Sequence, residues 1–205
     1  MTLRVTASSA GLSPGAVRTG VLLVRSSSGR APVVPVDVVV VVPKVQVAVE
    51  AGGGGNVVDA AGDTWTADRE YTPGGYGYVG DGTKAKTSPT DVKGTSEQGL
   101  FRSTREGMRA YRFDRLPDGV YTVELGFAET RHKNAGKRVF DVDVAGAPVI
   151  QGLDLAKEAG ENTAVTRQYT VRVTGGRLDV VFRPHKGDPI VNAIRVTERP
   201  DKAGA

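Results

Sequence analysis

The sequence predicts an all-β fold, an antiparallel, jelly-roll-like β-sandwich. Two observations predict it: apolar and polar residues alternate along many short segments, and turns rich in glycine and proline separate these segments. A period of two places alternate side chains on one face, which is typical of antiparallel strands that are covered on one side only. The period of an amphipathic helix is nearly absent.

The clearest alternation lies in the second half of the chain. It predicts strands at residues 121–127, 140–144, 169–173 and 178–182. The inward positions on these strands and on the last strand predict a buried core that contains Val123, Leu125, Phe127, Phe140, Val142, Val171, Val180 and Ile194.

Short turns separate the predicted strands. Gly175 and Gly176 stand between two alternating runs, so we expect a two-residue hairpin there, because both glycines can adopt a positive φ. The Pro-Asp-Gly sequence at 117–119 and the Ala-Gly pair at 145–146 predict further turns.

Two other segments differ from this pattern. Residues 72–99 are rich in Gly, Thr, Lys, Ser and Pro and lack periodicity, which predicts a long loop of functional or disordered character. Residues 153–159 predict a single helical turn. The four glycines at 52–55 lack the Lys-Ser/Thr ending of a phosphate-binding loop, so we expect them to allow a close approach of backbone or a tight strand exit.

Residues 1–43 have a different character from the rest of the chain. A predicted strand ends at Val24, and a second runs from Ala31 to Val42. These strands resemble the closing strands of immunoglobulin-like or fibronectin-like domains that lie beside the catalytic domain in bacterial secreted proteases and glycosidases. Two or three strands do not bury both faces of a sandwich. We therefore expect a partial domain of a longer protein; the alternative is an integral extension of the following domain.

Composition narrows the classes of function. The 205 residues carry a net charge of +4, and the 27 basic and 23 acidic residues are mixed along the chain, so we expect no nucleic-acid partner. The absence of cysteine excludes disulfides, thiolate metal sites and cysteine nucleophiles. The most apolar stretch, Val33 to Val42, is too short to cross a bilayer, and no signal peptide is recognisable, so we expect no membrane partner.

No arrangement of residues predicts a catalytic centre. The chain has two histidines and no Gly-x-Ser-x-Gly motif. Glu129 and Asp141 have the chemistry of a glycosidase acid pair, but a scaffold role is the simpler interpretation. No cofactor is expected, although Asp81 and Asp188 offer the oxygen ligands that a structural calcium ion prefers.

The aromatic residues point to a binding surface. Tyr71, Tyr76 and Tyr78 lie close together in a glycine-rich segment of a chain that is only 6% aromatic. An exposed tyrosine ring offers an apolar face and a polar tip, which suits a sugar. We expect Tyr76 or Tyr78 to line a ligand surface, whereas the single Trp65 is expected in the core.

An ordered series of motifs carries a family resemblance. The series is Val-Ala-Val-Glu-Ala-Gly-Gly-Gly-Gly from Val47, Asp-Thr-Trp-Thr-Ala-Asp around Trp65, Tyr-Thr-Pro-Gly-Gly-Tyr from Tyr71, Phe-Ala-Glu-Thr from Phe127 and Lys-Arg-Val-Phe-Asp-Val-Asp-Val from Lys137. It resembles the malectin family of carbohydrate-binding β-sandwiches. The resemblance implies a malectin-like domain at 45–199, followed by a tail at 200–205.

The resemblance also implies a ligand site formed by loops at one end of the sandwich. Transferred to this sequence, the site residues are Tyr76, Tyr78, Arg105, Glu106, Arg131, His132 and Asp188. Animal malectin has a tyrosine close to the position of Glu106, and a Tyr-Phe pair where this chain has Arg131 and His132. Three alternatives follow from the charged replacements: Arg131 and His132 donate hydrogen bonds to sugar hydroxyls, they favour an anionic sugar or a carboxylate, or the pocket holds no sugar and the module mediates contacts between domains.

These observations predict a non-catalytic carbohydrate-binding module that is accessory to a secreted, extracellular enzyme. Its expected partners are an oligo- or polysaccharide and an upstream catalytic domain of the same polypeptide. The alternative, from another class, is a structural or protein-interaction module that positions or stabilises a parent protease.

Overall fold

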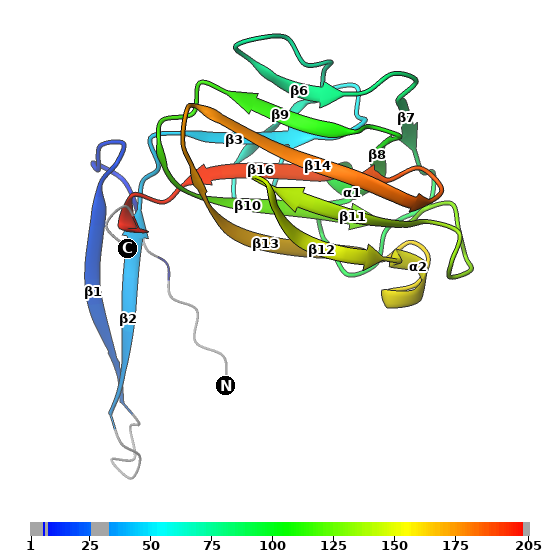
Figure 1. Ribbon diagram of the computed structural model, residues 1–205. Helices are drawn as coiled ribbons and strands as arrows, with labels where there is room; N and C mark the ends of the chain where they lie inside the picture. The colour runs from blue at the N-terminus through cyan, green and yellow to red at the C-terminus, as the bar shows by residue number, and fades with distance from the viewer. Residues whose placement is uncertain (1–5, 7, 26–32, 203–205) are drawn as a thin grey trace.

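The computed structural model describes residues 6, 8–25 and 33–202 and confirms the all-β class. Two sheets face each other (Figure 1). The first has the order β13 (Ala164–Val173), β10 (Gly119–Ala128), β16 (Ala193–Glu198), β3 (Gln46–Glu50), β5 (Thr64–Ala67) and β4 (Val57–Val58). The second has the order β12 (Ala147–Leu153), β11 (Val139–Val144), β14 (Arg177–Lys186), β9 (Ala110–Asp114) and β6 (Tyr76–Val79).

Smaller elements complete the sandwich. A third sheet contains β15 (Ile190–Val191), β8 (Ser103–Glu106) and β7 (Lys84–Thr87). Two single helical turns, α1 (Gln98–Phe101) and α2 (Leu155–Glu158), and the 3-10 turn η1 (Pro200–Lys202) are the helical elements of the described residues. None of these helices is long and apolar enough to span a membrane. The turn α2 confirms the helical turn predicted at 153–159; α1 was not predicted.

The core lies between the two large sheets, as the alternation predicted. All the predicted core residues are buried except Val171, which is partly buried and packs against the core from the edge strand β13. Phe127 on β10 and Phe140 on β11 are fully buried, and their ring centroids lie 6.1 Å apart across the sandwich. Trp65 is also buried, as expected, in a smaller cluster outside this core.

The hairpin predicted at Gly175 and Gly176 is wrong. Both residues have positive φ, 72° and 76°, but β13 and β14 belong to different sheets, so the turn carries the chain from one sheet to the other. The turn at 145–146 does form a hairpin, in which Val144 on β11 pairs with Ala147 on β12. Alternation predicts a strand from local residues, whereas the choice of partner depends on contacts far away in the sequence.

The long loop predicted at 72–99 is also corrected, because it contains β6 and β7 and the start of α1. Each of these strands has only four residues, and β7 is exposed throughout, so neither shows an alternating pattern. The close backbone approach expected at the glycines is confirmed. A Cβ atom on Gly52, whose φ is +82°, would lie 2.1 Å from the carbonyl oxygen of Thr104, and one on Gly53 would lie 1.5 Å from the Glu50 carboxylate.

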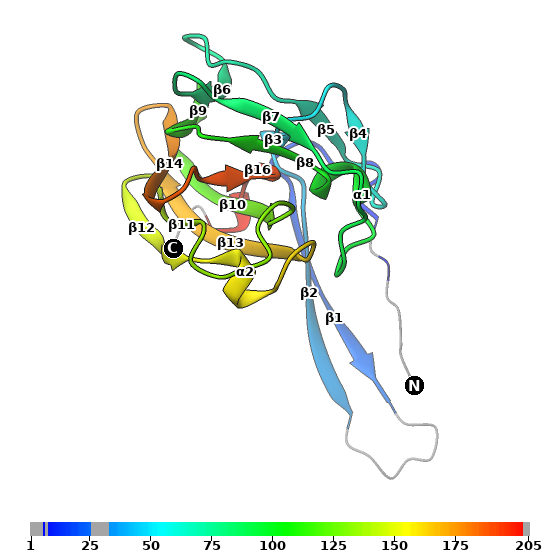
Figure 2. The ribbon, with the colours of Figure 1, turned by 90° about the vertical axis from the view of Figure 1, so that its right-hand side faces the viewer.

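Strands β1 (Val17–Val24) and β2 (Val34–Val41) pair with each other as an antiparallel ribbon. This N-terminal ribbon projects away from the sandwich in both views (Figures 1 and 2). Its large apolar side chains are exposed, namely Val21, Leu23, Val24, Val34, Val36 and Val39. The predicted start of the second strand at Ala31 lies outside the described residues, and the assignment of 1–43 to a partial domain stays a prediction.

Candidate functional site

The loop that follows β10 is fixed by a buried carboxylate at one end of the sandwich. Glu129 is 1% exposed, and its Oε1 atom accepts hydrogen bonds from the backbone N–H groups of Arg131 at 2.9 Å and His132 at 3.1 Å. Its Oε2 atom accepts a bond from Nε of Arg138 at 2.7 Å. The Phe-Ala-Glu-Thr motif therefore has a scaffold role, in which Glu129 holds the loop that presents two predicted site residues.

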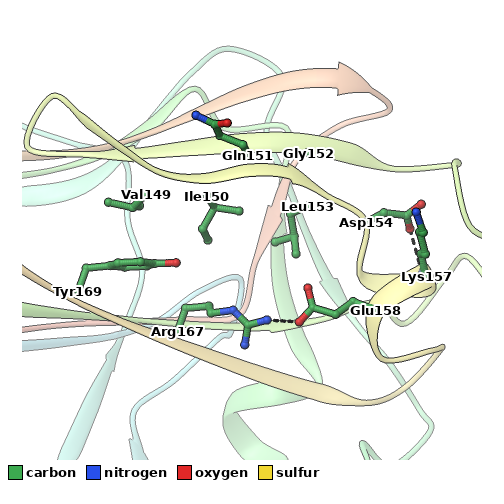
Figure 3. A pocket seen from close by; sticks show the side chains of 10 residues that line it. All are labelled: Val149, Ile150, Gln151, Gly152, Leu153, Asp154, Lys157, Glu158, Arg167 and Tyr169. Atoms are coloured by element: carbon green, nitrogen blue, oxygen red, sulfur yellow. Dashed lines mark hydrogen bonds and ion pairs between the residues drawn. The ribbon is translucent and has the colours of Figure 1, made fainter.

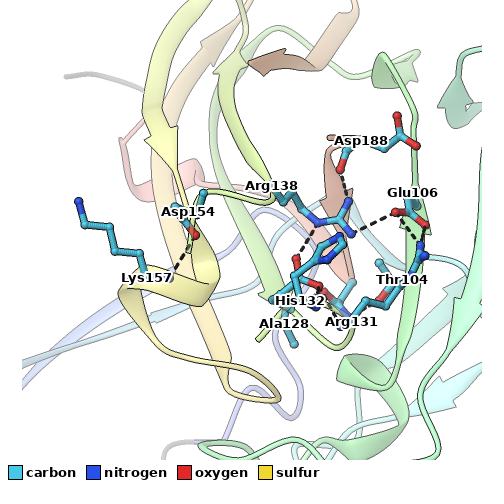
Figure 4. A network of polar contacts seen from close by, with 12 residues as sticks. Thr104, Glu106, Ala128, Arg131, His132, Arg138, Asp154, Lys157 and Asp188 are labelled. Atoms are coloured by element: carbon cyan, nitrogen blue, oxygen red, sulfur yellow. Dashed lines mark hydrogen bonds and ion pairs between the residues drawn. The ribbon is translucent and has the colours of Figure 1, made fainter. Parts of the chain in front are cut away.

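Arg138 connects this loop to two other segments (Figure 4). Its guanidinium, which is almost fully buried, donates to Glu129, to Glu106 on β8 at 3.0 Å and to the backbone carbonyl of Asp188. A charged group in such a position is tolerated only when it is fully paired. We call Glu106, Glu129, Arg131, Arg138 and the Asp188 carbonyl the polar network.

The surface of the polar network carries exposed polar groups. One nitrogen of Arg131 donates to both oxygens of Glu106, at 2.7 and 3.0 Å, while the Arg131 side chain stays 52% exposed. Within the described part of the chain, the His132 ring and the Asp188 carboxylate make no hydrogen bond or ion pair. The structure thus brings Glu106, Arg131, His132 and Asp188 to one end of the sandwich.

The cavity within the polar network is much smaller than a sugar. The cavity beside Thr104, Glu106 and Arg138 measures about 10 Å³. A cavity needs roughly 10–15 Å³ to hold a single water molecule. A ligand at this end would therefore contact the outer surface formed by Arg131, His132 and Asp188, and would not enter the sandwich.

Tyr76 and Tyr78, the tyrosines predicted for the site, lie on β6. A guanidinium covers one face of each ring: the guanidinium carbon of Arg69 lies 4.2 Å from the ring centroid of Tyr76, and that of Arg105 lies 4.0 Å from the centroid of Tyr78. Phe113 stacks beside Tyr76 at 6.1 Å. Neither tyrosine lines the small cavity, so a contact between these rings and a ligand stays a prediction.

Arg105 belongs to a second buried cluster. It forms a two-pronged ion pair with Asp68, at 2.7 and 2.8 Å, and the same carboxylate accepts a 2.6 Å hydrogen bond from the hydroxyl of Tyr111. Burial raises the pKa of Tyr111 well above its ordinary value. Nearby Glu50 has one buried oxygen without a hydrogen-bond partner, and burial raises the pKa of Glu50 to about 7. The sequence did not single out Glu50, because it follows an apolar run and no partner lies close to it in the chain.

Glu129 and Asp141, the two carboxylates with the chemistry of a glycosidase pair, lie in different clusters of residues. Glu129 is held by Arg138 inside the polar network, whereas Asp141 pairs with His185 at 2.8 Å and accepts a 2.6 Å bond from the Gly152 N–H. The Gly152 N–H and His185 lower the pKa of Asp141. No group of three or more His, Asp or Glu side chains converges within the described residues, so calcium binding by Asp81 or Asp188 stays a prediction.

A larger concave surface lies on the side of the sandwich, and sequence reasoning missed it. We call it the side groove; it lies between β12 and β13, which are the edge strands of the two large sheets, and measures about 420 Å³ (Figure 3). It is lined by Val149, Ile150, Gln151, Gly152, Leu153, Asp154, Lys157, Glu158, Arg167 and Tyr169. The available signal was Tyr169, a large aromatic residue on a strand that has neighbours on one side only.

Two curated relatives illustrate the similarity in sequence. The chain is 32% identical to Receptor-like protein 4 of Arabidopsis thaliana over 154 residues, which cover 68% of this chain and 25% of the relative. It is 30% identical to Malectin-B of Xenopus laevis over 87 residues, which cover 41% of this chain and 31% of the relative. The chain therefore spans only about a quarter to a third of these proteins.

A solved structure and a family model agree with these relatives. The crystal structure of a Bacteroides uniformis beta-glucuronidase matches with a TM-score of 0.71 and 25% identity, over 86% of this chain and 22% of that chain. This share exceeds residues 45–201, which make up 77% of the 205 residues, so it includes part of residues 1–44. Residues 45–201 match the model of the Malectin domain, and the chain belongs to the malectin domain family.

Proposed function

We propose that this malectin domain is a non-catalytic module that recognises a glycan on the outer surface of the polar network. The observation that carries the proposal is the state of Arg131. Glu106 holds one of its nitrogens, and half of its side chain remains exposed. A guanidinium that is already ordered loses little conformational entropy when it binds a ligand.

The exposed groups favour a sugar that carries a carboxylate. Arg131 and His132 donate hydrogen bonds, and an Arg–carboxylate pair is stronger than a bond between neutral groups. Asp188 accepts hydrogen bonds from hydroxyl groups. Because the cavity is closed and guanidinium groups cover one face of Tyr76 and of Tyr78, little apolar contact supports these polar bonds. We therefore expect weak binding, with a Kd of roughly 1 mM.

The similar proteins support a setting for this activity. The similarity to a beta-glucuronidase structure, of which this chain covers 22%, supports an accessory role in a larger secreted enzyme. The similarity to Receptor-like protein 4 supports an extracellular location. In this setting the module keeps a catalytic domain of the same polypeptide close to a glycan.

Titration calorimetry with digalacturonate and cellobiose tests the proposal. We expect digalacturonate to bind more tightly, and Arg131→Ala to weaken its binding about tenfold. The matched control is Arg183→Ala, which removes an arginine of similar exposure that pairs with Asp143. Binding of digalacturonate that Arg131→Ala does not weaken would contradict the charged site.

A protein-interaction role is the second candidate. The closed cavity at the loop end favours it, and so do the exposed apolar side chains of the N-terminal ribbon. In this case the domain positions or stabilises a catalytic domain of its own polypeptide. Absence of binding to either sugar, together with a stable complex between this chain and that catalytic domain, would support this alternative.

A further inference from the structure

We propose that the side groove between β12 and β13 is a second carbohydrate site, and that it takes a neutral sugar. The groove is distinct from the surface of Arg131, His132 and Asp188, and it shares with the proposed function only the premise that the domain binds glycans. Its size, its aromatic ring and its balance of charges support the inference.

The groove exists because the sandwich is open on this side. β12 is the last strand of one sheet and β13 the last strand of the other, so no further strand of either sheet fills the space between them. The turn α2 lies at one end of the groove (Figure 3). Ile150 and Leu153 are buried beneath it, and the volume of about 420 Å³ falls within the roughly 300–1,000 Å³ of small-molecule sites.

Tyr169 gives the groove an aromatic surface. Figure 3 shows its ring between Val149 and Arg167. The side chain is partly exposed, and its hydroxyl makes no hydrogen bond within the described residues. Among the described residues, arginine side chains lie over the rings of Tyr71, Tyr76, Tyr78 and Trp65, and none lies over the ring of Tyr169. The ring is thus available to the apolar CH face of a sugar.

The polar groups of the groove suit hydroxyls. Gln151 and the ammonium of Lys157 are exposed, and in the described structure neither side chain has a hydrogen-bond partner. Arg167 and Glu158 form an ion pair in the groove, between Tyr169 and Lys157 (Figure 3). The side chain of Gln151 points away from the groove, whereas within it Glu158 can accept hydrogen bonds and Lys157 and Arg167 can donate them (Figure 3).

The charges of the groove balance. Two cationic side chains, Lys157 and Arg167, face two carboxylates, Asp154 and Glu158. An anionic sugar would gain little net attraction here, in contrast to the surface around Arg131 and His132. The ligand class that fits is therefore a neutral hexopyranose unit of an oligosaccharide, with one face on Tyr169 and its hydroxyls on the neighbouring pair of Arg167 and Glu158 (Figure 3).

Amide chemical-shift mapping on the isotope-labelled 205-residue chain tests the inference. With cellobiose and maltose as neutral probes, we expect shifts at residues 147–158 and 164–173. With digalacturonate we expect them at residues 129–138. Tyr169→Ala should weaken binding of the neutral probes about tenfold, whereas Tyr169→Phe, which keeps the ring, should bind almost as the natural chain does.

Several results would overturn the inference. These are unchanged binding by Tyr169→Ala, neutral-probe shifts confined to residues 129–138, or a loss for Tyr169→Phe as large as that for Tyr169→Ala. Because Tyr169 is partly exposed, the variants should keep dispersed spectra, which checks their folding. If digalacturonate binds at 129–138 while the neutral probes bind nowhere, the side groove is refuted and the proposed function stands; the opposite pattern refutes only the charged surface.

Discussion

Strand β10 and the N-terminal ribbon have similarly apolar sequences and opposite surroundings. Val123, Leu125 and Phe127 on β10 are fully buried, whereas Val21 is 60% and Val39 is 50% exposed. β10 pairs with strands on both sides and faces a second sheet, while β1 and β2 pair only with each other. An apolar sequence pattern therefore predicts that a segment forms a strand. Whether its side chains are buried depends on the other strands and sheets that pack against it.

The pairing register gives the ribbon one fully aliphatic region. Leu22 pairs with Val36 and Val24 with Val34, and Val38 and Val40 continue the same face. The opposite face is interrupted by Thr19 and Asp37. The first face carries Arg18, which pairs with Val40, so each face of the ribbon is mainly aliphatic with one charged side chain. The match to the beta-glucuronidase structure covers 86% of this chain, which is more than residues 45–201 alone.

The largest expected effect comes from the core. Phe127→Ala should lower the free energy of unfolding by about 3–5 kcal/mol, because it opens a cavity between the two sheets. Val39→Ala on the ribbon should change it by less than about 0.5 kcal/mol, since this side chain is half exposed. Urea denaturation of both variants measures the contrast. Comparable losses would show that the ribbon contributes to the core.

The second largest loss of stability is expected from a substitution in the polar network. Arg138→Met leaves Glu106 and Glu129 without their shared guanidinium and should cost about 3 kcal/mol, at the lower end for buried pairs because Arg131 still contacts Glu106. The matched control is Arg183→Met, which removes a surface pair with Asp143 and should cost less than about 1 kcal/mol. Equal losses in denaturant titrations would mean that burial of Arg138 has no energetic consequence.

Glu50 lies on β3, an interior strand of the first sheet, and should make the free energy of unfolding depend on pH. Its pKa is raised from 4.5 to about 7, so the folded state binds more protons than the unfolded state between these values. Stability should therefore fall as the pH rises from about 4.5 to about 7, by on the order of 2 kcal/mol. Glu50→Gln should flatten this dependence. A slope that survives the substitution would assign the effect to other groups.

Removal of residues 1–43 should have the smallest effect. The deletion keeps Lys44, whose backbone N–H donates a 2.7 Å bond to Glu198, and removes no strand of the two large sheets, so the free energy of unfolding should change by about 1 kcal/mol or less. Limited proteolysis should cut near Pro43 and Lys44 and leave a resistant fragment that begins near Val45. Unfolding of the truncated chain would establish instead that the ribbon is an integral extension of the sandwich.

Sequence reasoning reached the fold and part of the site. Alternation predicted the buried face of β10 and β11, because the pattern is local. It failed at Gly175, where local residues specify a turn but not the sheet to which the next strand belongs. It also missed Arg138, whose partners lie 9, 32 and 50 residues away in the chain. Contacts between residues so far apart in the chain produce no recognisable spacing in the sequence. The side groove was missed for the same reason, because its edge strands come together only in the folded chain.

The first and last strands of the sandwich determine how the domain responds to a pulling force. β3 and β16 are antiparallel neighbours, with Val47 opposite Val196, and the bond between Lys44 and Glu198 closes the same end. A force applied through residues 44 and 199 would load the hydrogen bonds of this pair one after another, because such bonds lie perpendicular to antiparallel strands. The domain should thus unzip under tension and yield more easily than a sandwich whose terminal strands are sheared. A polypeptide stretched through both ends of this domain should therefore yield first between β3 and β16.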